Sequence, residues 1–173
     1  MKWFLCFLVK KLKIPRSIIK LKRIMHSLFE ASAVQAIIHR IEQLQPQSRA
    51  LWGKMTVAQM LAHSTGGMQM ATGEIELPRR FIGRLFAPFI KASYYNNRPF
   101  PKGINTDKAL IITQDKNFLA ERANLIQYIK QFHQGNKADC TRAPHPFLGH
   151  FTPEQWAKGM YKHLDHHLRQ FGV

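Results

Sequence analysis

Three histidines fall within five positions near the end of the chain, in the segment YKHLDHHLRQF. His163 and His167 are four residues apart, so on a helix their Cβ atoms lie on one face, about 5–6 Å from each other. Such a pair can bind one metal ion, provided that each imidazole nitrogen comes within about 2.0–2.1 Å of the ion. Two ligands bind an ion only weakly, and we therefore expect a third from another part of the chain.

The best candidate for the third ligand is His63, in the segment QMLAHSTGG. It lies beside Met60, Leu61 and Gly67, on the expected buried side of another helix. Three imidazole nitrogens leave coordination positions open for water and substrate, as a catalytic metal ion requires. A purely structural interpretation competes with this one. Histidines near a helix C-terminus interact favourably with the helix dipole, and buried histidines are usually just hydrogen-bonded.

The helix expected to carry His63 has a strong start signal. Thr56 and Gln59 form a capping box, in which the side chain of each residue bonds the backbone amide of the other. The helix is expected to end near Gly73, a suitable C-terminal glycine. The glycine pair at positions 66 and 67 weakens local helicity and could permit close approach of another backbone or a ligand.

The last helix, which carries the histidine pair, starts with the same signal. Thr152 is expected to be its N-cap, with Pro153 in the first helical position and Gln155 completing the box. Apolar periodicity predicts two further helices, over 31–44 and 117–134. No strand pattern is evident in the sequence. Four main helices predict an all-α, antiparallel four-helix bundle with a long connection between the second and third helices.

The long connection, residues 74–115, is rich in basic and aromatic side chains. Its piece PRRFIGRLFAPFIKASYY is typical of a short basic helix interrupted at Pro88, and NNRPFPKGINTDK is typical of a loop. A connection of this length is often a lid or a pocket wall, and a mobile surface is the equal alternative. Five aromatic residues interleave with its charges: Phe81, Phe86, Phe89, Tyr94 and Tyr95. This pattern suits a membrane surface or single-stranded nucleic acid, or else a packed aromatic core beneath a solvated basic face.

Residues 1–24 differ in composition from the rest of the chain. They hold eight of the 26 basic residues, no acidic residue, and an apolar run from Trp3 to Val9. The run is too short to span a bilayer and no small-residue cleavage site follows it, so neither a membrane span nor a secretory signal is expected. We therefore divide the chain into a basic extension, 1–24, and a helical domain, 25–173. The extension either precedes a natural start at Met25 or is a basic segment that contacts a membrane surface.

The two cysteines, Cys6 and Cys140, are far apart and form no CxxC motif. They predict a reducing compartment without a disulfide framework and, with no expected membrane span, a cytoplasmic location. Cys140 precedes His145 by five residues, so a nucleophilic pair is conceivable. A plain loop cysteine is the favoured interpretation, because no third group that would orient the pair accompanies it.

Two segments of the chain resemble a known superfamily. WGKMTVAQMLAHS, at 52–64, and HPFLGHFTPEQWAKGMYKHLDHHLRQFGV, at 145–173, resemble a domain-of-unknown-function branch of the DinB/YfiT-like metalloenzymes. The resemblance covers residues 25–173. It implies a four-helix bundle that binds a divalent ion, such as zinc or nickel, through one histidine of the second helix and two of an HxxHH-type motif on the last. In this sequence these ligands match His63, His163 and His167.

Three further residues lie within or beside these motifs. Gln59, one turn before His63, could line the pocket or support a ligand. His145 could contact substrate or act as a general base, or it could simply pack against its own loop. Asp165 lies roughly opposite His163 around the helix, so a solvated or salt-bridged role is expected.

These features predict a metal-dependent transferase or hydrolase that acts on a small molecule. The resemblance implies thiol-dependent transfer with a low-molecular-weight thiol as partner, whereas a metal-activated water would give hydrolysis. The alternative is a non-enzymatic basic protein that binds a membrane surface or, less favoured, nucleic acid. Bundles of this type often form homodimers, although no surface stripe in the sequence marks such an interface.

Overall fold

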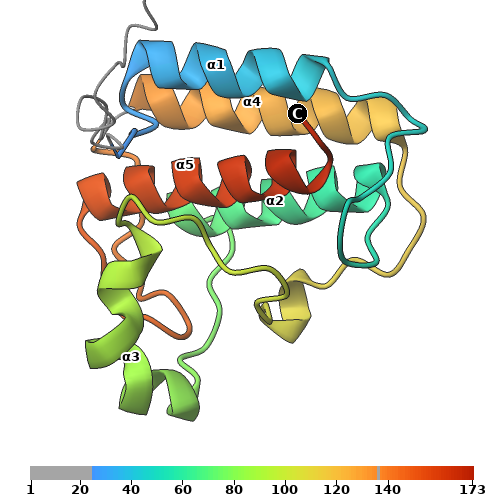
Figure 1. Cartoon of the computed structure of the whole chain (residues 1–173). Helices are drawn as coiled ribbons and strands as arrows, with labels where there is room; N and C mark the ends of the chain where they lie inside the picture. Colours follow the sequence, from blue (N-terminus) through green and yellow to red (C-terminus); the bar gives the residue numbers. More distant parts are fainter. Residues whose placement is uncertain (1–24, 136) are drawn as a thin grey trace, which may run out of the picture.

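The computed structural model describes residues 25–135 and 137–173, and within these ranges the protein is all-helical, as expected (Figure 1). The basic extension expected over 1–24 lies outside the described residues. The described residues form five α-helices and one 3-10 helix, in this order: α1 Ala31–Glu42, α2 Val57–Thr72, α3 Phe81–Tyr94, η1 Lys108–Leu110, α4 Phe118–Gly135 and α5 Pro153–Gln170. No strand occurs in the described ranges. No helix there is both long and apolar enough to cross a bilayer.

Both capping boxes are present, which confirms the expected starts of α2 and α5. The Thr56 hydroxyl accepts a hydrogen bond from the Gln59 amide at 3.2 Å, and Gln59 Oε1 accepts one from the Thr56 amide at 3.0 Å. Thr152 and Gln155 repeat this exchange at 3.2 and 3.0 Å. The two helices that carry the predicted metal ligands are therefore positioned by local sequence signals.

Four of the helices, α1, α2, α4 and α5, lie side by side around a shared core. α2 packs against α4 and α5, and α1 packs against the same two helices (Figure 1). The core contains fully buried residues from all four, among them Ile37, Leu61, Ile129 and Trp156. The packing of α2 on α5 is the contact that matters for function, because it brings distant histidines together.

The long connection departs from expectation at α3. The expected interruption at Pro88 is wrong, because α3 continues unbroken from Phe81 to Tyr94. Pro88 lies on the exposed side of the helix, where water can hydrogen-bond the carbonyl of Arg84 that the missing N–H leaves without a helical partner.

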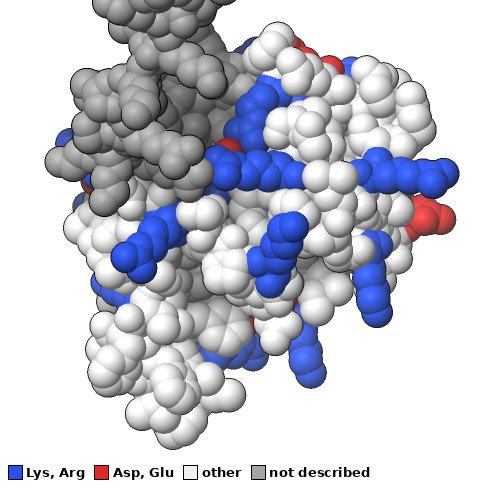
Figure 2. All heavy atoms as spheres, in the orientation of Figure 1, with Lys and Arg blue, Asp and Glu red and all other residues white. Residues whose placement is uncertain are grey.

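The aromatic residues of this segment confirm only part of one sequence interpretation. Phe81, Phe86 and Phe89 are exposed, whereas Tyr94 stacks on the ring of Phe151 at 5.1 Å between centroids. A packed aromatic core therefore lies beneath the end of this segment, as one sequence alternative predicted, but does not include the three phenylalanines. Gly83 is among the few buried positions of α3, and a Cβ there would collide with the backbone of Phe147. The helix thus touches the protein along a narrow edge, and it forms a lobe that projects from the molecule at the lower left of Figure 2, where the face drawn is mostly free of charged side chains.

Candidate metal centre

The three predicted ligands meet between α2 and α5. His63, His163 and His167 each offer one ring nitrogen, and these atoms all lie within 4.8 Å of one another. The Nε2 atom of His163 is 3.2 Å from Nε2 of His63 and 3.2 Å from Nε2 of His167. A histidine separated from the other two by a hundred residues therefore faces the same point in space, and this cluster could hold a metal ion.

A glycine makes room for the cluster. The side chains of α5 approach α2 at Gly67, where an added Cβ would lie 3.1 Å from Cε1 of His163 and 3.1 Å from Cε of Met160. The neighbouring Gly66 faces a side chain of the long connection, because a Cβ there would lie 3.2 Å from Leu110. The glycine pair thus permits close approach, but the groups that approach are side chains and not the backbone or ligand that the sequence suggested.

Two carbonyl oxygens fix the orientation of two of the rings. His63 Nδ1 lies 2.9 Å from the backbone oxygen of Leu110, and His167 Nδ1 lies 2.8 Å from Oε1 of Gln170. Carbonyl oxygens only accept hydrogen bonds, so each Nδ1 carries the proton and each Nε2 presents a free lone pair. The Gln170 amide is oriented in turn, because its Nε2 donates to the oxygen of Trp52 at 2.7 Å.

Burial keeps the three imidazoles neutral. It lowers the pKa of His167 to about 3, lowers that of His63, and lowers that of His163 well below its usual value, with the neighbouring histidines adding to the effect at His163 and His167. Neutral imidazole is the form that coordinates a metal, so protons compete weakly with a metal ion at neutral pH.

The donor set fits a divalent ion such as zinc. Nitrogens at about 2.0–2.1 Å from a tetrahedral ion are separated by about 3.3 Å from one another, close to the two observed separations of 3.2 Å. His163 Nδ1 is buried without a hydrogen-bond partner among the described residues. Its Nε2 faces two free lone pairs, an arrangement that a cation at the shared point would satisfy.

Gln170 is expected to be a positioning residue for this centre. In Gln170→Ala, His167 loses the acceptor that fixes its tautomer, and we expect the affinity for zinc to fall about 10–100-fold. Competition with a chelating dye measures this affinity, with circular dichroism to verify that the helices remain. Gln47→Ala, at an exposed position, is the matched control and should bind zinc like the wild type. Equal affinity in all three proteins would contradict the role of Gln170.

Two other polar residues of α5 do not join the cluster. Asp165 forms ion pairs with Arg40 at 2.8 Å and Arg169 at 2.9 Å, which confirms the expected salt-bridged role. His166 is half-buried, and its ring contacts the ring of Trp52 edge-on at 5.7 Å between centroids.

Gln59 is engaged at the start of α2. Its side chain completes the capping box with Thr56 and donates to the oxygen of Gln114 at 3.3 Å. These contacts describe a capping and loop-tethering residue. Its expected role in the pocket stays a prediction.

His145 lies in a turn that leads into α5, closed by reciprocal backbone hydrogen bonds between His145 and Gly149. Its Nδ1 accepts hydrogen bonds from the amides of Phe147 and Leu148, at 3.2 Å each, so the proton of the neutral ring is on Nε2. Burial, and then the charge of Arg79, lower the pKa of His145 to about 4. This geometry favours the loop-packing alternative, and a general-base role stays a prediction.

Cys140 is a buried loop residue. Burial and the neighbouring Asp139 and Glu154 raise the pKa of its thiol to about 11. A thiol of this kind remains protonated near neutral pH, which supports the interpretation as a plain loop cysteine.

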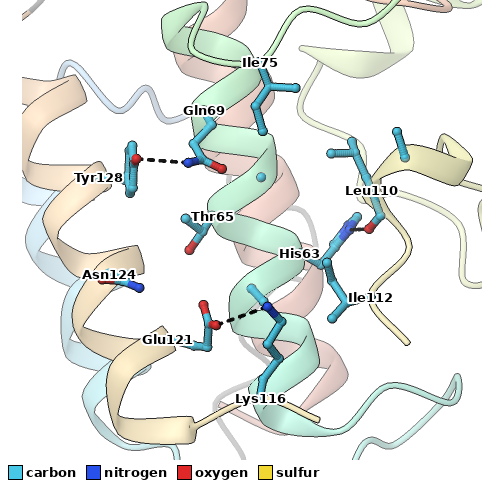
Figure 3. A pocket seen from close by; sticks show the side chains of 13 residues that line it. His63, Thr65, Gln69, Ile75, Leu110, Ile112, Lys116, Glu121, Asn124 and Tyr128 are labelled. Atoms are coloured by element: carbon cyan, nitrogen blue, oxygen red, sulfur yellow. Dashed lines mark hydrogen bonds and ion pairs between the residues drawn. The ribbon is translucent and has the colours of Figure 1, made fainter. Parts of the chain in front are cut away.

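A cavity of about 360 Å³ adjoins His63 on the side of the long connection (Figure 3). Leu110 and Ile112 form one wall, so this part of the connection is a pocket wall, as one of the two sequence alternatives predicted. The facing wall is polar and is formed by α4 and the residues just before it: Lys116, Glu121, Asn124 and Tyr128. Sequence reasoning missed these residues, although the helical spacing of the last three was a usable signal.

Comparison with known protein families places the helical part of the chain. Residues 25–172 match the family described as "Protein of unknown function (DUF1569)". No curated protein and no solved structure shows significant similarity to the chain. The match starts at Met25, where the helical domain is expected to begin, although the division of the chain at that residue stays a prediction. Since the match covers most of the sequence, the chain belongs to the DUF1569 family.

Proposed function

We propose that this protein is a metal-dependent enzyme that binds one divalent ion, zinc or nickel, through His63, His163 and His167. The observation that carries the proposal is the convergence of three Nε2 atoms, two of them on rings whose tautomer is fixed by carbonyl oxygens. We infer further that α1, α2, α4 and α5 form the antiparallel four-helix bundle of the DinB/YfiT-like proteins. Their mutual packing and the motifs at 52–64 and 145–173 support that inference.

The residues of the centre define the chemistry. A bound divalent ion lowers the pKa of a coordinated water or thiol and polarises a substrate carbonyl. All three ligands are neutral and do not reduce the net charge of the site. The positive charge of the ion would therefore favour an anionic fourth ligand, such as a hydroxide or a thiolate. Leu110 and Gln170 hold the rings in place, and the burial of His63 and His167 restricts access by bulk water.

The reaction is thiol-dependent transfer or hydrolysis of a small molecule. The centre is too enclosed for a macromolecular substrate to reach it without rearrangement, since His63 and His167 are both buried. The cavity of about 360 Å³ is lined by His63 but by neither His163 nor His167, and its size is in the range that accepts small ligands, about 300–1,000 Å³. Low-molecular-weight thiols are the expected co-substrates of the transfer reaction.

The test compares apo protein with protein loaded with zinc or nickel in two assays. One assay follows consumption of a low-molecular-weight thiol with an electrophilic acceptor, and the other follows hydrolysis of small esters and amides. We expect metal-dependent turnover in one assay for the wild type and for His39→Ala, an exposed control, and none for His167→Ala. Equal rates in the wild type and His167→Ala would overturn the proposal.

A further inference from the structure

α3 presents a broad apolar face to solvent. Six large side chains on this helix are exposed, with Phe81 at 81% and Phe89 at 82%: Phe81, Ile82, Leu85, Phe86, Phe89 and Ile90. Their spacing places all six on one half of the helix circumference, which we call the α3 face. A contiguous apolar surface of this kind on a folded domain marks an interaction site.

The base of α3 is held firmly while its apolar face points outward. Arg80 forms two hydrogen bonds with the Asp107 carboxylate, at 2.7 and 2.8 Å, and Arg79 donates to the oxygen of His145 at 2.9 Å. At the other end, Lys91 donates to the oxygen of His150. Small buried residues, Gly83 and Ala87, form the contact edge. The fold therefore positions the α3 face as a projecting surface (Figure 2).

The surroundings of this face are cationic. Residues 77–106 contain no Asp or Glu and six basic residues: Arg79, Arg80, Arg84, Lys91, Arg98 and Lys102. Arg84 is exposed on α3 itself, and the whole chain carries a formal net charge of +16. A second copy of the chain on this face would bring like charges together, which opposes association. An anionic partner matches the charge.

We propose that the α3 face docks the protein onto an anionic lipid bilayer. Amphipathic helices with Phe and Leu on one side and Lys or Arg beside it lie in the membrane interface, with the apolar side inserted by about 5–10 Å. α3 has 14 residues and is about 21 Å long, so it lies in the interface and does not span the bilayer. A lipid surface accepts six bulky apolar side chains at once, which a nucleic acid does not.

Vesicle flotation of the full-length protein tests the proposal. The wild type should bind phosphatidylcholine vesicles that contain phosphatidylglycerol, bind pure phosphatidylcholine more weakly, and lose binding as salt rises. Phe81→Ser combined with Phe89→Ser should lower the partition coefficient about tenfold or more, because two of the largest inserted side chains are lost. The matched control is Leu51→Ser with Leu119→Ser, at positions 69% and 63% exposed outside α3, and should bind like the wild type.

The two double variants distinguish vesicle binding by the α3 face from vesicle binding by other parts of the protein. All variants keep residues 1–24, so a difference between the two double variants belongs to α3. Unchanged binding after loss of both phenylalanines would overturn the proposal. So would a wild-type dimer that this substitution dissociates without any vesicle binding, or binding of single-stranded DNA in place of vesicles. The zinc content of the phenylalanine variant should equal that of the wild type, which keeps this test independent of the metal centre.

Discussion

His163→Ala is expected to abolish retention of the bound metal. The Nε2 of His163 is the central atom of the cluster, 3.2 Å from the Nε2 of His63 and of His167, and it comes from the same helix as His167. Without it, two nitrogens on different helices remain. Loss of a residue that only supports a ligand typically lowers metal affinity about 10–100-fold, and loss of the ligand itself should lower it further. Metal content after dialysis, measured by plasma mass spectrometry, gives the result directly.

His39→Ala is the control for this experiment. His39 is exposed on α1 and its ring contacts Gln43, so its loss removes a histidine without touching the cluster. The wild type and the control should retain one equivalent of metal while His163→Ala retains almost none. If His163→Ala retained as much metal as the other two proteins, the three-histidine centre would be wrong, even if the enzyme activity proposed for it were found elsewhere.

Trp156→Ala should be the most destabilising single substitution on α5, at about 3–5 kcal/mol. The ring of Trp156 is completely buried and contacts the ring of Phe151 at 5.1 Å and that of His145 at 5.8 Å between centroids. Removing it leaves a cavity beneath the turn that supports α3. Urea unfolding followed by circular dichroism measures the loss of stability.

Trp156→Phe provides the matched comparison. The indole Nε1 of Trp156 is buried without a hydrogen-bond partner among the described residues, and such a group costs about 1–3 kcal/mol. Phenylalanine removes this penalty and keeps most of the ring, so Trp156→Phe should lose much less stability than Trp156→Ala. Similar losses for the two variants would show that packing beneath the turn is not what Trp156 contributes.

The features of this protein that sequence alone determined are local ones. The starts of α2 and α5 follow from capping boxes whose partners are three residues apart, and Asp165 forms an ion pair with Arg169, four residues further along α5. The pairing of His163 with His167 follows from helical periodicity. In each case the interacting groups are close in sequence, so the helix geometry by itself decides where they lie.

Tertiary structure decided the features that depend on contacts between distant segments. The tautomer of His63 depends on the backbone oxygen of Leu110, and no spacing rule links His63 to a carbonyl in a connection 47 residues away. The outward direction of the apolar side of α3 is another such feature, since its amphipathic pattern is equally compatible with a buried helix. Which face of a helix is buried depends on what the rest of the chain packs against it. Here the domain packs closely against α3 only at the edge formed by the small residues Gly83 and Ala87, and the apolar side remains exposed.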